Sequence, residues 1–218
     1  MDIKTKINFY GHSFFLITST EGTKIGTDPY DESVKSPLPV VSADIVLVSH
    51  SHYDHNNISL FKGNPEIIKN AGSYEIKNVK INGFNSYHDK SKGMARGKNI
   101  IFKFIVDEIK FAHLGDLGDV PDENVLNELK DLDIMFIPVG GIFTINAKEA
   151  VNLIEILKPK IAIPMHFKEK DTMLRVDNIN PFKNNIPKNI SVKEFSKNFE
   201  ITKEELPEKT AVWIIYSS

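Results

Sequence analysis

The segment between positions 50 and 55 concentrates side chains that bind metals. It reads His50-Ser51-His52-Tyr53-Asp54-His55, so three imidazoles and one carboxylate fall close together. Imidazole nitrogens and carboxylate oxygens are ligands of Zn²⁺ and of related divalent ions. His50 and His52 alternate and can aim at one ion, while Asp54 and His55 turn toward a second. The segment therefore predicts metal chemistry.

Four more metal-competent residues occur singly, each just after a strand-like run or between two such runs: His88, His113, Asp116 and His166. Side chains that follow strands on one side of a sheet converge at one edge. The chain has no cysteine, so disulfides and thiolate chemistry are excluded and any metal site must use imidazole and carboxylate.

His113 competes with His88 for the role of the third histidine ligand. It precedes Asp116 by three positions, and strand alternation should point these two side chains in different directions. His88 ends an extended segment and opens a glycine-containing loop. We favour His88 as the ligand and place His113 behind the ligands or in the core, with the reverse assignment as the alternative.

A pair of divalent ions held by this set would support hydrolysis. Two ions about 3.5 to 4 Å apart can share a water and lower its pKa from about 15.7 toward about 7, which yields metal-bound hydroxide at neutral pH. One ion can polarise a carbonyl or phosphoryl oxygen, the other can steady the leaving oxygen, and Asp54 can orient the water or accept a proton. Imidazole-rich sites suit Zn²⁺, with Mn²⁺, Fe²⁺ or Ni²⁺ as alternatives.

Five other residues carry weaker signals, each with an ordinary structural alternative. Asp28 either accepts a hydrogen bond from a ligand imidazole or forms a turn. His12 either faces the substrate or is a simple turn residue. Gly140 and Gly141 either offer backbone N–H groups to an anion or mark a tight turn. Arg96 either binds a phosphate or carboxylate or is a solvated surface arginine.

Short β-rich runs would position these residues. The first three runs, separated by turns near residues 11 and 21, predict antiparallel hairpins. Residues 44–48 form a nearly continuous aliphatic run, typical of a strand buried on both faces, and this run leads into the segment at His50. The strands expected are 6–9, 13–18, 24–27, 44–48, 66–69, 79–84, 100–106, 109–112, 134–138, 161–163 and 211–216.

Two amphipathic helices are predicted between these strands. One starts near Asp122, and the other follows Asn146, which forms a capping box with Glu149. Strands followed by helices after His50, Asp116 and Gly140 indicate a layered α/β protein. Residues 167–188 are rich in Lys, Asn and Pro and are expected to be irregular, as a flap or as a contact between two copies of the chain.

Composition limits the classes of function. The chain has 218 residues, of which 41% are hydrophobic, and this predicts one domain over residues 1–218. A formal net charge of -2 provides no global basic field for nucleic acid. No apolar run approaches a membrane span and no leader pattern precedes the first strand, so we expect a cytoplasmic protein that acts on a small molecule.

Taken together, these motifs resemble the metallo-β-lactamase superfamily. The resemblance rests on H-x-H-x-D-H at residues 50–55, then a lone His88, Asp116 after a glycine, and a final His166. A closer likeness is to its small single-domain branch of ascorbate-6-phosphate-lactonase-like hydrolases, through Gly11-His12-Ser13-Phe14, Thr27-Asp28-Pro29, Gly115-Asp116-Leu117-Gly118 and the segment 138–144. It covers about residues 11 to 166.

This resemblance implies a four-layer αββα sandwich of the α/β (α+β) class, with metals at one edge. It assigns one metal to His50, His52 and His88 and the other to Asp54, His55 and His166, with Asp116 bridging. The function implied is a dinuclear metal-dependent hydrolase of a small, anionic ester, lactone or phosphodiester.

Three rival functions are less well supported. RNA-processing nucleases share the motif, but their usual large inserted domain has no room here. Oxygen chemistry at a di-iron site would lead one to expect Glu at the position of His52. A non-catalytic scaffold or sensor is favoured by a degenerate ligand set, and every ligand position here is filled.

Overall fold

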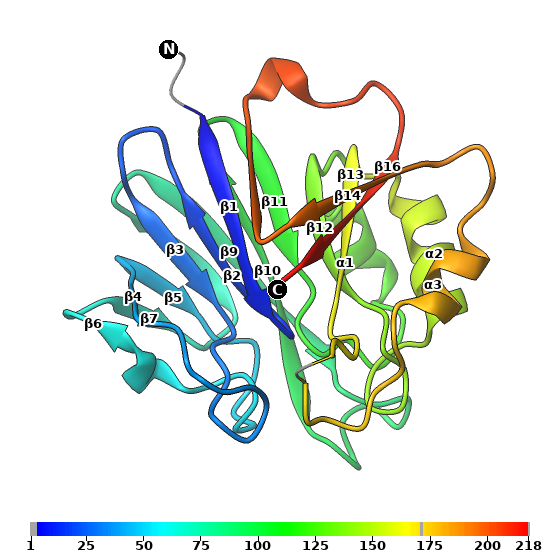
Figure 1. Ribbon diagram of the computed structural model, residues 1–218, viewed down its shortest axis with the longest axis horizontal. Coiled ribbons are helices and arrows are strands. Elements are labelled where there is room, and N and C mark those ends of the chain that lie inside the picture. Colours follow the sequence, from blue (N-terminus) through cyan, green and yellow to red (C-terminus); the bar gives the residue numbers. More distant parts are fainter. Residues whose placement is uncertain (1–3, 171, 218) are drawn as a thin grey trace.

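Two β-sheets face each other in the computed structural model, which describes residues 4–170 and 172–217 (Figure 1). The six-stranded sheet has the order β15 (Asn198–Ile201), β1 (Thr5–Gly11), β2 (Phe14–Thr18), β3 (Lys24–Thr27), β5 (Ile45–Leu47) and β7 (Glu66–Ile68). The eight-stranded sheet has the order β14 (Ser191–Ser196), β16 (Ala211–Tyr216), β13 (Ile161–Met165), β12 (Ile134–Pro138), β11 (Ile109–His113), β10 (Lys98–Val106), β9 (Val79–Tyr87) and β8 (Gly72–Ile76).

Strand direction explains where the site forms. In the six-stranded sheet β1, β2 and β3 are antiparallel, whereas β3, β5 and β7 are parallel. In the other sheet β8 to β11 are antiparallel, and β11, β12, β13 and β16 are parallel. Strands β1 and β5 therefore run in one direction in their sheet, as β9, β11, β12 and β13 do in theirs. Residues after these strands collect at one edge.

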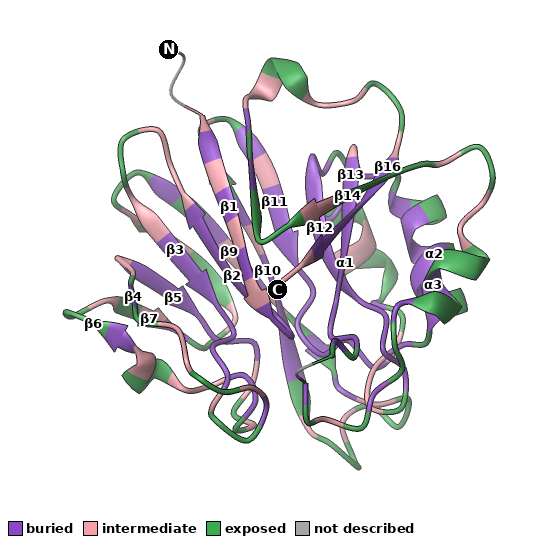
Figure 2. Ribbon diagram, in the orientation of Figure 1, coloured by how far each residue is buried: buried purple, intermediate pink, exposed green. Residues whose placement is uncertain are grey.

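Aromatic and aliphatic side chains fill the space between the sheets. Figure 2 shows the strands as mostly buried along this interface. Phe15 on β2 and Phe136 on β12 come from different sheets, and their ring centroids lie 4.1 Å apart. Phe9 stacks on Phe15 with a centroid separation of 4.7 Å. One continuous apolar core thus joins the sheets and fixes the edge at which the polar residues meet.

The helices pack on the eight-stranded sheet (Figure 1). Helix α1 (Glu123–Glu128) is capped by Asp122, and α2 (Ala147–Leu157) begins with the predicted capping box of Asn146 and Glu149. Both predicted helices are confirmed. Helix α3 (Asn180–Asn185) was not expected, because its short polar sequence lacks a helical apolar period and only Phe182 is buried. Position 171, in the segment expected to be irregular, lies outside the described residues.

The outer face of the six-stranded sheet is covered differently. Chain from the segment 29–44 and the small pair β4 (Val41–Ser42) and β6 (Phe61–Lys62) packs there, with Phe14, Tyr30 and Phe61 in a second apolar cluster. The prediction of a helix after His50 is wrong. Turns follow His50, and then the single 3₁₀ turn η1 (Ile58–Leu60), and this described stretch contains no α-helix. A second 3₁₀ turn, η2 (Lys203–Glu205), precedes β16.

The mixed α/β sandwich agrees with the predicted fold class, and the unexpected strands are mainly peripheral. Strands β8 and β14 form the two edges of the large sheet, and β15 forms an edge of the other. Strands β8 and β14 are largely exposed, and β15 alternates but is only four residues long, so the sequence pattern is too weak to predict them. Among the described helices, none is long and apolar enough to cross a membrane.

Candidate metal centre

All seven predicted ligands meet at one edge of the sandwich, together with His12. Each comes from the end of a strand: His12 from the turn after β1, residues 50–55 from the chain after β5, His88 after β9, Asp116 after β11 and His166 after β13. Residues distant in the chain thus form one cluster because the strands carrying them end together.

Apart from a set in which Asp28 joins His50 and His55, the ligand atoms fall into two groups. His50, His52 and His88 present nitrogens that all lie within 4.8 Å of one another. A second group consists of Asp54, His55, His166 and His12, whose ligand atoms also lie within 4.8 Å of one another and whose side chains are all buried. His12 is the member of this group that the sequence did not identify as a ligand.

Asp116 lies between the two groups. Its Oδ1 is 3.1 Å from Nε2 of His55, and its Oδ2 is 3.2 Å from Nε2 of His88 and 3.2 Å from Nε2 of His166. Its side chain is almost completely buried. One carboxylate therefore contacts ligand residues from both groups, which is the geometry that a bridging ligand needs.

Asp28 orients two of the histidines from the side away from the cluster: His55 directly, and His50 through Ser49. Its Oδ2 accepts a hydrogen bond from Nδ1 of His55 at 2.9 Å and another from the hydroxyl of Ser49 at 2.6 Å. Oγ of Ser49 also lies 2.9 Å from Nδ1 of His50. These bonds leave Nε2 of both imidazoles facing the cluster. Ser49 was not predicted, because a serine within an apolar strand end carries no distinct pattern.

His113 belongs to neither group. Its Nε2 donates to the backbone carbonyl of Ser13 at 3.0 Å, and its Nδ1 accepts from the N–H of Gly115 at 3.2 Å. With both ring nitrogens engaged, His113 supports the chain that carries Asp116 and lies 3.8 Å from Asp28. His88, and not His113, lies with His50 and His52, and its role as the third histidine ligand stays a prediction.

Asn99 holds the loop that carries Asp116, and the sequence did not reveal this role. Its Oδ1 accepts from the N–H of Asp116 at 3.0 Å, and its Nδ2 donates to the carbonyl of Leu114 at 2.9 Å. Gly115, with a φ of +56°, lies between them, where a Cβ would approach Oδ1 of Asn99 to 2.3 Å. The chain can pass this point only as glycine.

Three site residues adopt the left-handed backbone region, which is unfavourable for residues other than glycine. His12 has φ 56°, Asp28 φ 40° and His166 φ 55°. The N–H of His166 donates to the carbonyl of His12 at 2.8 Å, so the strained turns of the two sheets are joined. Such strain costs about 1 to 3 kcal/mol per residue and is typical of functional sites.

His50, His12 and Asp116 are held in the protonation states that bind metals, whereas His55 would release a proton when a metal binds. Burial lowers the pKa of His50 to about 3, and burial together with His166 lowers the pKa of His12 to about 4. Burial alone would lower the pKa of His55, but Asp116 and Asp28 outweigh it and raise that pKa well above its usual value. Burial opposes ionisation of Asp116, yet His166 and His55 hold its pKa well below the usual range.

The donor atoms fit divalent metal ions. Neutral imidazoles and ionised carboxylates are the forms that bind metals. Within the described part of the chain, Nε2 of His50, Nε2 of His166 and Oδ1 of Asp116 are buried without a satisfactory hydrogen-bond partner. Buried polar atoms of this kind are costly unless something satisfies them, and a cation would satisfy all three.

The rim of the site is built by two loops. The guanidinium of Arg96 stacks over the ring of Phe143, 4.3 Å from its centroid. Asp89 accepts the backbone N–H of Arg96 at 2.7 Å, which orders the first loop. Gly140 packs so closely that a Cβ would lie 2.0 Å from the carbonyl of His166, and Gly141 has a φ of +57°. The glycine pair therefore makes a tight turn beside His166.

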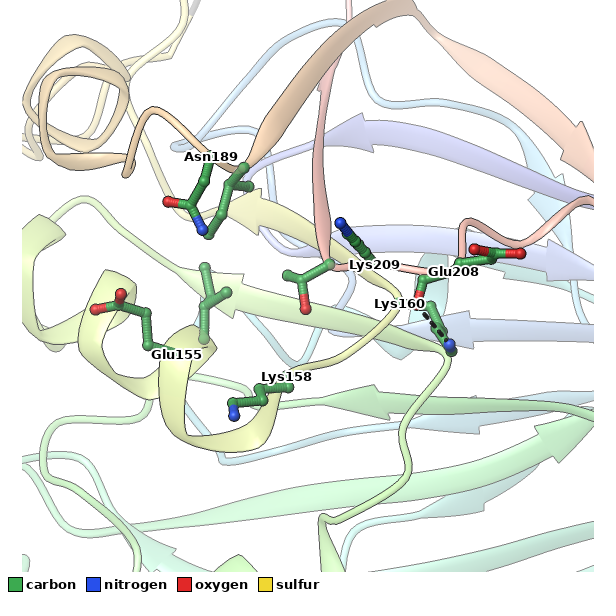
Figure 3. A pocket seen from close by; sticks show the side chains of 9 residues that line it. Glu155, Lys158, Lys160, Asn189, Glu208 and Lys209 are labelled. Carbon is green, nitrogen blue, oxygen red and sulfur yellow. Dashed lines mark hydrogen bonds between the residues drawn. The ribbon is translucent and has the colours of Figure 1, made fainter.

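One cavity lies beside the metal-binding residues, and a second lies away from them. One of about 420 Å³ is lined by His50 together with Lys69, Asn85 and Lys98, among other residues. Another of about 380 Å³ lies at the opposite ends of β13 and β16, where Figure 3 shows Lys160 and Glu208 among the lining residues. None of the predicted site residues lines this second cavity.

Known proteins resemble this chain in sequence and in fold. The family described as Beta-lactamase superfamily domain matches residues 6–166. A UPF0173 metal-dependent hydrolase of Thermococcus onnurineus is 30% identical over 190 residues, covering 74% of this chain and 84% of that protein. A UPF0173 metal-dependent hydrolase of Carboxydothermus hydrogenoformans is also 30% identical, over 191 residues, covering 74% of this chain and 84% of that protein.

A solved structure supports the same family. It is a Thermotoga maritima protein assigned to the Zn-dependent hydrolases of the metallo-β-lactamase superfamily, with 35% identity and a TM-score of 0.80. The match covers 97% of this chain and 98% of that one. The chain therefore belongs to the metallo-β-lactamase superfamily, as one of its metal-dependent hydrolases.

Proposed function

We propose that this hydrolase uses a dinuclear metal centre to cleave a small anionic ester, lactone or phosphodiester. The observation that carries the proposal is the carboxylate of Asp116, within 3.2 Å of a nitrogen of His55, of His88 and of His166. One ion would be held by His50, His52 and His88 and the other by Asp54, His55 and His166, with Asp116 shared. Zn²⁺ is our first choice, with Mn²⁺, Fe²⁺ or Ni²⁺ as alternatives.

Bound divalent ions supply Lewis acidity and lower the pKa of water, so no serine or cysteine nucleophile is required. Asp28 and Ser49 orient the imidazoles of His55 and His50. Burial opposes ionisation of Asp54, but its hydrogen bond from His12 and the charge of His55 hold its pKa below the usual range. An ionised Asp54 in this position would orient the attacking water and accept its proton.

The rim supports an anionic substrate. Stacking on Phe143 occupies one face of the Arg96 guanidinium and leaves its in-plane N–H donors available to a phosphate or carboxylate. We assign the Gly140-Gly141 turn as a second anion-binding element, through backbone N–H groups next to His166. Substrates of the ascorbate-6-phosphate-lactonase-like branch, which are small and anionic, are the first candidates.

Hydrolysis of a panel of small esters tests the proposal. The metal-loaded chain should turn over anionic lactones or phosphodiesters more efficiently than structured or single-stranded RNA. Asp116→Ala should lose metal and turnover together, whereas Asp119→Ala, which removes a carboxylate from the same loop, should keep both. Efficient RNA cleavage without turnover of the small esters would overturn the substrate class, and full activity with at most one ion per chain would overturn the dinuclear centre.

A further inference from the structure

We propose that His12 is a metal ligand of the group formed by Asp54, His55 and His166, giving this ion one more protein ligand than the other. The inference rests on the metal centre proposed above. His12 lies in the turn between β1 and β2, and only 1% of its surface is exposed. A side chain so enclosed is placed to contact the ligands around it rather than a substrate arriving from solvent.

The distances around His12 match those between ligands of one ion. Its Nε2 lies 3.1 Å from Nε2 of His55 and 3.3 Å from Oδ2 of Asp54. Two atoms that each lie about 2.1 Å from one metal are separated by about 3.0 Å at a right angle and about 3.4 Å at a tetrahedral angle. The pair formed by His55 and Asp116, at 3.1 Å, falls in the same interval.

The hydrogen bonds of the two imidazoles support the same role. Nδ1 of His55 donates to Asp28, so once the ring is neutral, as metal binding requires, its lone pair lies on Nε2, which faces His12. Nδ1 of His12 is buried and has no hydrogen-bond partner among the described residues. When an ion binds, His12 would move the proton that its Nε2 directs at Asp54 to Nδ1, so that Nε2 presents a second lone pair. In those forms two nitrogen lone pairs face each other at 3.1 Å, an arrangement that a cation between them stabilises, whether a shared proton or a metal ion.

The backbone holds His12 in this position. A register shift between Phe9 and Gly11 interrupts the pairing of β1 with β2 just before the turn. His12 then takes a left-handed conformation, and its carbonyl accepts the N–H of His166. The end of β13, which carries His166, is thus tied directly to the hairpin turn that carries His12. The position of His12 is set by both sheets.

This assignment makes the two metal sites unequal. The first ion would have four protein ligands, His50, His52, His88 and the shared Asp116. The second would have His12, Asp54, His55, His166 and the shared Asp116, which exceeds the four ligands that Zn²⁺ usually takes. The second site therefore favours an ion that accepts a higher coordination number, such as Mn²⁺, Fe²⁺ or Co²⁺.

Cobalt titration of the full-length, metal-stripped chain tests this. Wild type should bind about two Co²⁺ per chain, and the visible absorption of the second site should have the low intensity of five- or six-coordinate cobalt. His12→Asn tolerates the left-handed backbone and removes the imidazole. We expect this variant to lose at least about tenfold in affinity at one site, with stronger absorption as coordination falls. Lys158→Asn, which replaces another left-handed residue (φ 49°) at the C-terminal end of α2, is the matched control and should leave the second site unchanged.

The outcomes separate this inference from the proposal on which it rests. If wild type binds no metal or only one, the dinuclear centre itself is wrong. If wild type binds two ions and His12→Asn has the same affinities and spectrum, His12 is not a ligand and the dinuclear centre stands. If the variant does not fold, as judged by circular dichroism, the wild-type spectrum decides: tetrahedral cobalt at both sites would overturn the inference.

Discussion

Oδ2 of Asp28 accepts a hydrogen bond from Nδ1 of His55 at 2.9 Å, and the same oxygen accepts the hydroxyl of Ser49, which in turn contacts His50. One buried carboxylate therefore orients an imidazole in each metal-binding group. Carboxylates behind ligand histidines fix the ring orientation and raise the basicity of the ligand. Asp28 links the two halves of the centre without itself facing them.

We expect Asp28→Asn to weaken metal binding by roughly 10- to 100-fold, because the amide cannot replace the ionised acceptor. Competition against a chelator measures the affinity. Asp44→Asn, which removes a surface partner of Lys77, is the control and should bind metal as wild type does. Equal affinities in both variants would show that Asp28 only shapes the turn before Pro29.

Removal of the metal should leave a folded but less stable protein. The apolar core between the sheets does not include the ligands, so it persists in the apo form. Loss of a ligand that binds only the native state lowers the melting temperature. Circular dichroism with and without a chelator measures both effects. Complete loss of secondary structure at room temperature would contradict this view.

His88→Ala should lower metal occupancy more than His113→Ala does. Nε2 of His88 contacts the carboxylate of Asp116, whereas both nitrogens of His113 are engaged by Ser13 and Gly115. His113→Ala should instead lower stability, because a buried carbonyl loses its donor. Elemental analysis and thermal unfolding under identical metal loading distinguish the two. An equal or reversed loss of metal would mean that the wrong histidine was chosen.

The apo protein should lose stability as the pH falls from about 6.5 to about 4.5. His12 and His50 stay neutral in the fold, with pKa values lowered to about 4 and about 3. In the unfolded chain both bind a proton near pH 6.5, so acid favours unfolding. Each contributes a loss on the order of 2 kcal/mol at the lower pH. Urea midpoints in chelator measure the effect, and a midpoint independent of pH would contradict it.

Arg96→Ala should raise the KM for an anionic ester by about tenfold and leave a neutral ester of the same size unaffected. Arg96→Lys should recover only part of this loss, because lysine keeps the charge but not the planar donors or the stacking on Phe143. Arg175→Ala, another exposed arginine, is the control. An unchanged KM in Arg96→Ala would remove this residue from the substrate site.

The sequence by itself determined most of the strands, the capped helix after Asn146 and the residue types of the metal centre. These features depend on neighbours in the chain: an aliphatic run before His50, an alternation of buried residues, and a capping pair three positions apart. The edge strands and α3 were not predicted, because exposed or very short elements bury too few residues to show a regular spacing of apolar side chains.

Only the tertiary structure decided which distant side chains meet. His12 and His166 are joined by a backbone hydrogen bond, and Asn99 holds the N–H of Asp116, although none of these pairs is close in the chain. Such contacts depend on strand register and on the packing of one sheet against the other. A lone histidine in a turn looks ordinary in the sequence. It joins Asp54, His55 and His166 only when β5 of its own sheet and β13 of the other sheet bring these partners within reach.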